Sequence, residues 1–454
     1  MNKRFPFSHM FFCLLVAAAL FYGCSGKRIV ELKKEKLFTI PVGKGLEEIG
    51  VHREKNGQFS GPTTVLFKNG FFYIVDHVNQ KVLKVTTPGD IILTLSKGES
   101  DIEPDDETVL RLKERKSYPF NLIGEIAVDS ENNIYIEDKL INAGPEKTEI
   151  DVFDPSSGAG EGGEEMYVSY ILKFDRLGRH LTKIGKGGPG SEPFFYVYKM
   201  DVDNEGNLIV LTGEGEWRKW TYYKFDPDGN LLFYQVIESE QIFSVKDMEK
   251  VGFFILDLFP VRNSNSIVFW VSLYDTSYDT QNVNKEEEIW GEEIEIENTE
   301  GVKGSRKGTG KKYQRDLLYY KLLFYNIESR NIEKSYRWEN RDDVQSAPTE
   351  ELLGLDGKTN GFLWRYIDAT RAVVSIFRPN GTQVARRSFV FEENGLWADV
   401  RVAEDGSVTG VKIDDASISF FRWRSDELVN RKPQKVSLKE FFRDKIEEFR
   451  NANR

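Results

Sequence analysis

Apolar residues along this chain come in short runs, and pairs of turn-forming residues separate them. The clearest set spans residues 64–95, where Asn69-Gly70 and Pro88-Gly89 divide neighbouring runs. Short apolar runs divided by such pairs are typical of antiparallel strands joined by tight turns. The pattern therefore predicts a four-stranded sheet. Its strands are Thr64–Lys68, Phe71–Asp76, Lys81–Thr86 and Asp90–Leu95.

A small sheet of this kind needs neighbouring sheets to bury its faces, and the same pattern does recur along the chain. Copies two and three begin at Pro119-Phe120 and Pro193-Phe194 and share a Val-Asp phrase before a polar turn. Copy four is weaker and copy five is clear. The strands predicted for copies two to five are 125–129, 133–138, 170–175, 180–185; 199–203, 207–211, 221–226, 231–237; 256–262, 266–273, 317–326, 332–338; and 352–356, 361–367, 372–378, 382–389.

Copy six contains only three predicted strands, at Asp399–Ala403, Ser407–Ile413 and Ala416–Trp423. A missing fourth strand would leave an exposed sheet edge, which favours aggregation. The apolar stretch Lys36–Pro41 can supply it, because it precedes copy one where an outermost strand precedes every other copy. We therefore predict an all-β, six-bladed β-propeller over residues 36–430, closed by this N-terminal strand.

The N-terminus has the features of an export signal followed by a lipidation site. Asn2-Lys3-Arg4 precedes an apolar stretch from Met10 to Tyr22, which is too short to cross a membrane as a mature helix. The stretch ends at Gly23-Cys24, a small residue before a cysteine, as in bacterial lipoproteins. We predict a signal peptide at 1–23, fatty acylation of Cys24 and a linker at 24–35. The alternative is a plain signal peptide that leaves Cys24 as a free thiol.

The motif Gly57-Gln58-Phe59-Ser60-Gly61-Pro62, followed by a turn glycine and a strand that ends at Asp76, resembles the NHL-type propeller repeat. Together with Cys24, the chain resembles propeller lipoproteins of spirochaetes. The resemblance covers residues 36–425 and implies a propeller fastened to the cell envelope, with the outer membrane favoured. It implies little about activity, because a fold does not determine a function.

Composition narrows the classes of partner. The formal net charge is −11, and loss of Lys3 and Arg4 with the signal makes it −13, which argues against nucleic acid as a partner. Cys24 is then the one remaining cysteine, so an internal disulfide is excluded.

At 431–454, the capping box Ser437–Glu440 and apolar residues at helical spacing predict a short amphipathic helix. It packs on the ring or, alternatively, contacts a membrane or partner.

The long connections all belong to one face of the predicted ring. Second-to-third turns and links between copies share that face, and they include every long insertion, whereas the other turns are short. Binding residues concentrate on loops that a rigid scaffold holds, so we predict a binding face here. Solvated insertion is the alternative, above all for Lys285–Lys312. The long connections are Ser96–Tyr118, Lys139–Ser169, Gly213–Trp220 and Tyr274–Arg315.

Aromatic and basic residues in these connections are the candidate ligand-binding residues. Trp217, Arg218 and Trp220 lie in one connection and Trp290 in another. Tryptophan and arginine are enriched in interface hot spots, and tryptophan also stacks on sugars. The alternative is that each tryptophan covers its own blade. His77 follows a strand end and is a further candidate, although a turn histidine is the commoner case.

Catalytic patterns are scarce in the sequence. No histidines share a metal-ligand spacing, and no nucleophile elbow is present. Asp76, Asp138 and Asp175 follow strand ends and are predicted to cap turns. Glu125 clearly places an acid at the start of an inner strand, but the other copies begin with Thr64, Lys199, Leu256, Leu352 and Asp399, which do not form a convincing metal cage. We therefore predict a non-catalytic binding or scaffold module without a cofactor, whose partner is an envelope protein or glycan. The alternative is a hydrolase or lyase with a metal in the central channel.

Overall fold

The fold was analysed in a computed structural model of the whole chain. The structure describes residues 30–53, 59–60, 64–97, 115–141, 167–185, 194, 196–214, 219–242, 251–275, 317–338, 351–368, 370–391 and 396–430. Within these ranges no helix is long and apolar enough to cross a membrane.

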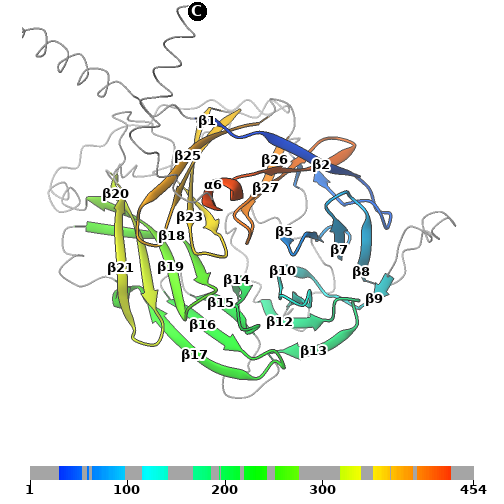
Figure 1. Cartoon of the computed structure of the whole chain (residues 1–454). Helices are drawn as coiled ribbons and strands as arrows, with labels where there is room; N and C mark the ends of the chain where they lie inside the picture. The colour runs from blue at the N-terminus through cyan, green and yellow to red at the C-terminus, as the bar shows by residue number, and fades with distance from the viewer. Residues whose placement is uncertain are drawn as a thin grey trace, which may run out of the picture.

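Six sheets stand around a common axis and form a six-bladed β-propeller, as predicted (Figure 1). In each blade the first strand lies innermost, and the chain meanders outward through antiparallel pairs. Blades one to three are β5 (Thr64–Lys68), β6 (Phe71–Asp76), β7 (Lys81–Thr86), β8 (Ile91–Ser96); β10 (Ile123–Val128), β11 (Ile134–Ile141), β12 (Tyr167–Phe174), β13 (His180–Ile184); and β14 (Val197–Val202), β15 (Leu208–Glu214), β16 (Lys219–Phe225), β17 (Leu231–Glu238).

Blades four and five follow the same order, and blade six takes three strands from the end of the chain. These strands are β18 (Val251–Val261), β19 (Ser266–Asp275), β20 (Leu317–Asn326), β21 (Asn331–Trp338); β22 (Glu351–Leu355), β23 (Gly361–Asp368), β24 (Arg371–Phe377), β25 (Gln383–Val390); and β26 (Leu396–Val402), β27 (Val408–Ile413), β28 (Ser417–Trp423).

The N-terminal strand closes the ring, as predicted. Strand β2 (Lys34–Pro41) pairs antiparallel with β28 and completes blade six. A second strand in this region was not predicted. The two-residue β1 (Val30–Glu31) pairs parallel with β25 on the outer edge of blade five. The N-terminal stretch therefore lies on two blades rather than one.

Other short elements were also missed. Strand β9 (Arg115–Ser117) adds a parallel fifth strand to blade one, and β3 (His52–Arg53) pairs with β4 (Phe59–Ser60). The helices α3 (Ser239–Ile242) and α6 (Asp426–Asn430) are each about one turn long. The amphipathic helix expected at 431–454 lies outside the described residues, so α6 is the C-terminal helix of the structure.

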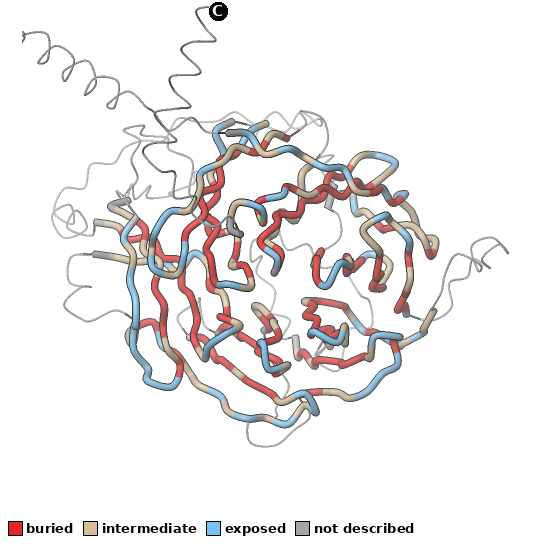
Figure 2. The backbone as a smooth tube through the Cα atoms, viewed as in Figure 1, coloured by how far each residue is buried: buried red, intermediate tan, exposed pale blue. Residues whose placement is uncertain are grey.

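The hydrophobic core is divided among the boundaries between blades, because alternating strand residues point to opposite sheet faces. One apolar cluster lies at each of the six boundaries. At the closure, Phe38 of β2 stacks on Phe420 of β28 with ring centroids 4.5 Å apart. Figure 2 shows that burial is greatest in the strands between the axis and the rim. Each blade is therefore stabilised by both of its neighbours.

The recurring Val-Asp phrase has a local cause. Asp203 accepts hydrogen bonds from the backbone N–H groups of Glu205 and Asn207 at 2.9 and 2.8 Å, and from the side chain of Asn207 at 3.0 Å. Asp129 and Asp356 form the same contacts with the residues two and four positions later. Each aspartate thus satisfies backbone donors that the turn leaves unpaired. This motif keeps the first-to-second turns short and rigid.

Candidate ligand-binding site

The two faces of the ring differ in their connections. We call the face with the first-to-second and third-to-fourth turns the short-turn face, and the opposite one the long-loop face. The turns of the short-turn face run from two residues at 69–70 to five at 129–133. The connections 142–166 and 276–316 both join second to third strands, so they leave the long-loop face. The predicted asymmetry between the faces is therefore confirmed by the strand order.

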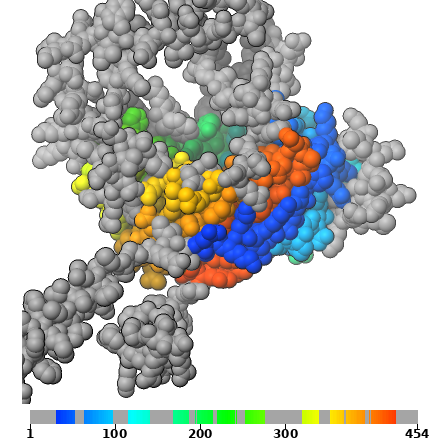
Figure 3. Space-filling view, turned by 90° about the horizontal axis from the view of Figure 1, so that it is seen from above, coloured from blue at the N-terminus to red at the C-terminus, as the bar shows by residue number. Residues whose placement is uncertain are grey.

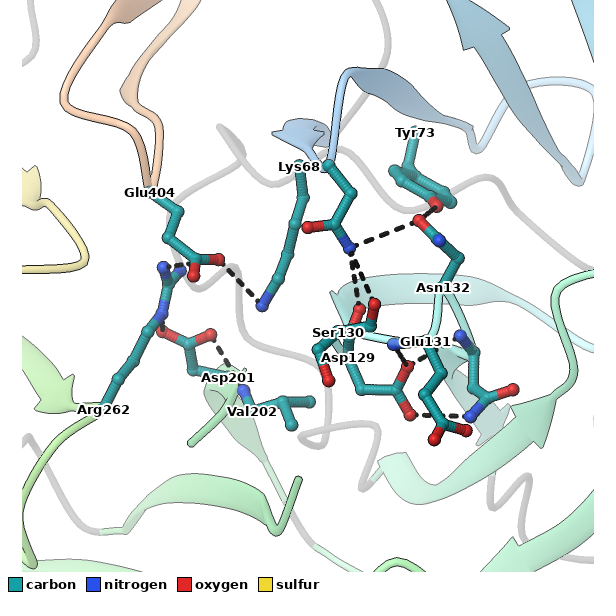
Figure 4. Close-up of polar contacts among 12 residues, drawn as sticks. Lys68, Tyr73, Asp129, Ser130, Glu131, Asn132, Asp201, Val202, Arg262 and Glu404 are labelled. Carbon is teal, nitrogen blue, oxygen red and sulfur yellow. Dashed lines mark hydrogen bonds and ion pairs between the residues drawn. The ribbon is translucent and has the colours of Figure 1, made fainter. Parts of the chain in front are cut away.

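At the short-turn face, ion pairs join four blades across the axis (Figure 4). The Nζ atom of Lys68 lies 3.1 Å from Oε2 of Glu404, and Nη1 of Arg262 lies 3.2 Å from the same oxygen. Nε of Arg262 also donates to Oδ2 of Asp201 at 2.7 Å. We call these four residues the axial bridge. They come from blades one, six, four and three, so the bridge fastens distant blades together.

Electrostatics supports the charged state of the bridge. Burial disfavours the charge of Arg262, but Asp201 and Glu404 outweigh it and raise the pKa of the guanidinium. Burial raises the pKa of the Glu404 carboxyl, but Lys68 and Arg262 lower it by more, so the net shift of this pKa is downward. Both groups are therefore ionised at neutral pH and hold each other in place.

A second set of charged side chains lies deeper along the axis. Lys199 pairs with Asp257, whose carboxylate also accepts a hydrogen bond from the hydroxyl of Tyr198 at 2.6 Å. Arg401 pairs with Asp399. Burial disfavours the charge of Arg401, but Asp399, Glu125 and Asp257 raise its pKa, so acids of blades two and four act on a cation of blade six. These side chains therefore lie near the common axis.

Bulges in the inner strands explain this orientation. The pairing register shifts between Ile123 and Ile126, between Val197 and Lys199, and between Ile255 and Asp257. The inner strand of blade six shifts between Ala398 and Arg401, and Asp399 within it has a positive φ of 47°. A bulge re-aims the side chains beside it. Glu125, Lys199 and Asp257 thereby leave the normal alternation and reach the axis.

Glu137 is a buried acid beside this set. Its side chain is 0% exposed and accepts hydrogen bonds from the hydroxyl of Ser169 at 2.7 Å and the backbone N–H of Glu125 at 2.9 Å. The carboxylate occupies the space above Gly124, where a Cβ atom would lie 2.1 Å from Oε2. Burial raises the pKa of Glu137, although Lys139 opposes it. Gly124 is thus required for this acid to fit.

Exposed aromatic residues lie on the long-loop side of blades three to five, one in each blade. Tyr196 precedes β14, Phe254 lies in the first half of β18, and Tyr366 lies near the end of β23, with exposed fractions of 49%, 48% and 43%. Inner strands begin and second strands end at the long-loop face. Burial and then Glu351, at the start of β22, raise the pKa of Tyr366, and burial and then Asp257 raise the pKa of Glu351. Tyr366 thus adjoins an acid that is in turn close to Asp257.

Of the predicted ligand-binding residues, the structure describes Trp220 and His77. Trp220 is 1% exposed and packs edge-on against Phe269 with ring centroids 5.9 Å apart. It fills the boundary between blades three and four, so it covers its own blade and offers no face for stacking. Trp217, Arg218, Trp290 and Cys24 lie outside the described residues.

His77 is half-buried in the turn after β6. Burial lowers the pKa of His77, and His52 lowers it further, while Asp76 opposes both. Asp76 itself accepts hydrogen bonds from the backbone N–H groups of Gly50 and Asn79 at 2.9 and 3.0 Å. Among the described residues, no group of three His, Cys, Asp or Glu side chains is arranged to hold a metal ion.

Asp76 and Asp175 cap turns, as predicted, whereas the prediction was wrong for Asp138, which lies within β11 and binds the segment before β10. Asp138 accepts a hydrogen bond from the backbone N–H of Asn121 at 2.7 Å. Asp175 accepts from the backbone N–H groups of Leu177 and Arg179 at 2.9 and 2.8 Å. These carboxylates are therefore occupied by backbone donors.

Sequence reasoning recognised Glu125 but missed most of the axial residues. The available signal was a departure from the repeat, since Val261 and Ala403 occupy the position of the turn-capping aspartate, and Arg262 and Glu404 follow them directly. A blade that omits the turn-capping aspartate can direct a charge elsewhere. The partner of that charge lies in another blade, and spacing along the chain does not reveal it.

Comparisons with known proteins add little beyond the fold. No family model and no curated protein matches the chain. Three similar solved structures are a streptogramin B lyase, a protein of unknown function from Dyadobacter fermentans DSM 18053 and a polysaccharide lyase, at 10%, 11% and 9% sequence identity. The matches cover 87%, 86% and 87% of this chain and 98%, 99% and 99% of those chains, with TM-scores of 0.35, 0.39 and 0.39. At these values they carry no argument about function.

The six-bladed fold therefore rests on the strand order of this chain. Without a matching family, the resemblance to NHL-type repeats and spirochaete lipoproteins stays a prediction.

Proposed function

We propose that this protein is a lipid-anchored module of a bacterial cell envelope that binds an envelope protein or glycan through its long-loop face and catalyses no reaction. The observation that carries the proposal is the contrast between the faces. On the short-turn face, capped turns and the axial bridge use the polar groups for contacts within the chain. On the long-loop face, large aromatic side chains stay exposed.

The exposed aromatics suit either kind of partner. An aromatic ring contributes large apolar area at small conformational cost, and it stacks on sugar rings as well as on protein side chains. The nearby acids Glu125 and Glu351 provide acceptors for hydroxyl or amide groups. The experiment therefore has to distinguish the two partners.

A binding test uses purified full-length protein against peptidoglycan and outer-membrane glycan fractions by co-sedimentation, with capture from envelope extract as the protein arm. The double variant Phe254→Ala/Tyr366→Ala is expected to lose binding at least tenfold. The matched control is Leu232→Ala/Tyr234→Ala, which removes side chains of similar exposure from the rim strand β17. Equal binding by both variants would contradict the proposal. Binding that survives protease treatment of the fraction assigns a glycan.

The rival reading, a metal-dependent hydrolase or lyase, draws on the acids near the axis. Glu125, Asp257 and Asp399 come from blades two, four and six, and charged axial side chains can support chemistry. The discriminating measurement is the metal content of purified protein. One equivalent of a divalent cation that Asp257→Asn abolishes would favour the rival over a binding module.

The anchor is tested separately. Mass spectrometry of the N-terminal peptide from membrane-extracted protein is expected to show an acylated Cys24, and Cys24→Ser is expected to abolish acylation. Protease treatment of intact cells then reports which leaflet displays the ring.

A further inference from the structure

The N-terminal stretch fastens one side of the ring to the anchor. Val30 and Glu31 pair with Arg387 and Ser388 of blade five, and the backbone N–H of Leu32 donates to Ser388 at 3.0 Å. Strand β2 then continues along the outer edge of blade six. Figure 3 shows this stretch, in blue, lying against the orange residues of the last blades. The chain thus enters the fold at the rim of blades five and six.

The proposed anchor lies close to this entry point. Val30 lies six positions after Cys24, with five residues between them. A fully extended chain spans at most about 3.6 Å per residue, so the tether reaches about 20 Å. An acylated Cys24, on which this inference rests, would hold the rim of blades five and six near the bilayer surface. The opposite rim, at blades two and three, would lie a full ring diameter away.

The outer hairpin of blade five has the charge that suits this position. Residues 371–390 contain Arg371, Arg378, Arg386 and Arg387 and no acidic residue, in a chain with a net charge of −11. Arg371, Arg378 and Arg386 are exposed. The corresponding hairpin of blade three, 219–238, contains two lysines and three acids. The hairpin of blade two, 167–184, also has four Lys and Arg residues but contains one acid, so the hairpin of blade five is distinguished by having no acid at all.

Three acids of blade six and of α6 form ion pairs with cations outside the hairpin. Glu35 of β2 pairs with Arg422 at 2.9 Å. Asp426 and Glu427 of α6, which packs against β25, pair with Arg424 at 3.0 and 3.7 Å. Two further acids lie beside the hairpin itself, because Glu31 pairs with Ser388 of β25 and Asp368 pairs with Arg371 of β24. The exposed Arg378 and Arg386 lie at other positions of the hairpin.

We propose that the arginine hairpin of blade five docks on anionic lipid headgroups beside the anchor, so that the ring stands on its rim. Arginine binds phosphate oxygens in a bidentate manner. A basic cluster gains from an anionic surface only within a Debye length, about 10 Å at 0.1 M salt. The short tether keeps the hairpin near that range. A ring on its rim leaves both faces open to partners.

The test measures which rim approaches the membrane. In the acylated protein Cys24 is blocked and Cys13 has left with the signal, so an introduced cysteine takes a fluorophore at one site. Gln383→Cys places it on β25 of blade five, and Leu181→Cys places it on β13 of blade two, both at exposed positions. The protein is reconstituted in phosphatidylglycerol-containing vesicles with a nitroxide headgroup quencher. Quenching is expected to be at least threefold stronger at position 383.

Charge dependence completes the test. Arg378→Gln/Arg386→Gln is expected to reduce the difference in quenching to what the tether alone produces, as is phosphatidylcholine alone or 0.5 M salt, and an undiminished difference would contradict docking by the arginines. The matched control Arg176→Gln/Lys183→Gln removes two charges from the blade-two rim and is expected to keep the difference. Equal quenching at both rims of an acylated protein would overturn the rim-docking proposal while the anchor stands. An unacylated Cys24 would instead overturn the proposed anchor.

Discussion

The short-turn and long-loop faces of this ring divide stability from recognition. On the short-turn face, side chains serve the chain itself, because aspartates cap the turns and the axial bridge joins four blades. On the long-loop face, strand ends expose Phe254 and Tyr366. The two faces are built from the same strands, but their side chains tolerate substitution differently. Substitutions should cost stability on one face and binding on the other.

The largest effect is expected at Trp220, which was predicted as a ligand contact and lies in the core. Trp220→Ala should lower the free energy of unfolding by about 3–5 kcal/mol, because it empties the boundary between blades three and four. This change in the free energy of unfolding is measured by urea denaturation, with circular dichroism as the signal. Phe254→Ala, on the long-loop face, is the control and should change stability by less than about 1 kcal/mol. Similar losses in both variants would break the comparison.

The axial bridge should give the next largest effect. Arg262→Met leaves Asp201 and Glu404 without their shared cation and should cost about 2–4 kcal/mol. The double variant Arg262→Met/Asp201→Asn should recover part of this loss, because it removes one of the unpaired charges. The recovery is measured by comparing the unfolding midpoints of the single and double variants. Independent, additive losses would show that the two side chains do not act together.

Two copies of one turn motif in blade three sharpen the comparison further. Asp203 is buried near the axis and also pairs with Lys224 at 2.9 Å, whereas Asp226 forms the same turn at the exposed rim. Asp203→Ala should cost about 2 kcal/mol and Asp226→Ala about 0.5–1 kcal/mol. Thermal unfolding of the two variants compares them directly. A larger loss for Asp226→Ala would contradict the view that contacts near the axis matter most.

Low pH should destabilise the contacts of the short-turn face, and this loss of stability should be the smallest of the effects predicted here. The pKa of Glu404 is lowered in the folded protein, so its stabilising contribution is complete above its ordinary pKa near 4.5 and is lost as pH falls through the lower folded value. The unfolding temperature should therefore fall between about pH 5 and pH 3. Glu404→Gln should flatten that fall in calorimetry. An unchanged slope would exclude the bridge as its source.

Most of the fold could be predicted from the sequence because the information is local. Each predicted strand of the six blades is present, with boundaries that mostly differ by one or two residues, since alternation and turn pairs act over a few positions. The closing strand was predicted from the unpaired edge of copy six. Strands β1 and β9 were missed because two or three residues carry no alternation, and only the neighbouring edge defines them.

The site was less predictable, for a different physical reason. The bridge joins Lys68 to Glu404, which are far apart in sequence and meet only because the ring closes. The bulge at Asp257 re-aims a side chain without leaving a turn signature. The burial of Trp220 could not be read from the sequence, because its neighbours in sequence are polar, while its neighbours in space belong to the next blade. Burial of this kind is a property of the assembled ring.

The pairing of β2 with β28 also sets an order of events during synthesis. Glu35 and Arg422 touch across this pair although 387 positions separate them. Strand β2 leaves the ribosome among the first residues and must wait for its hydrogen-bond partner until almost the whole polypeptide has been made. A chaperone that shields an apolar strand edge during this interval would therefore be expected to raise the yield of folded protein, and removing β28 should leave an aggregating product rather than a five-bladed one.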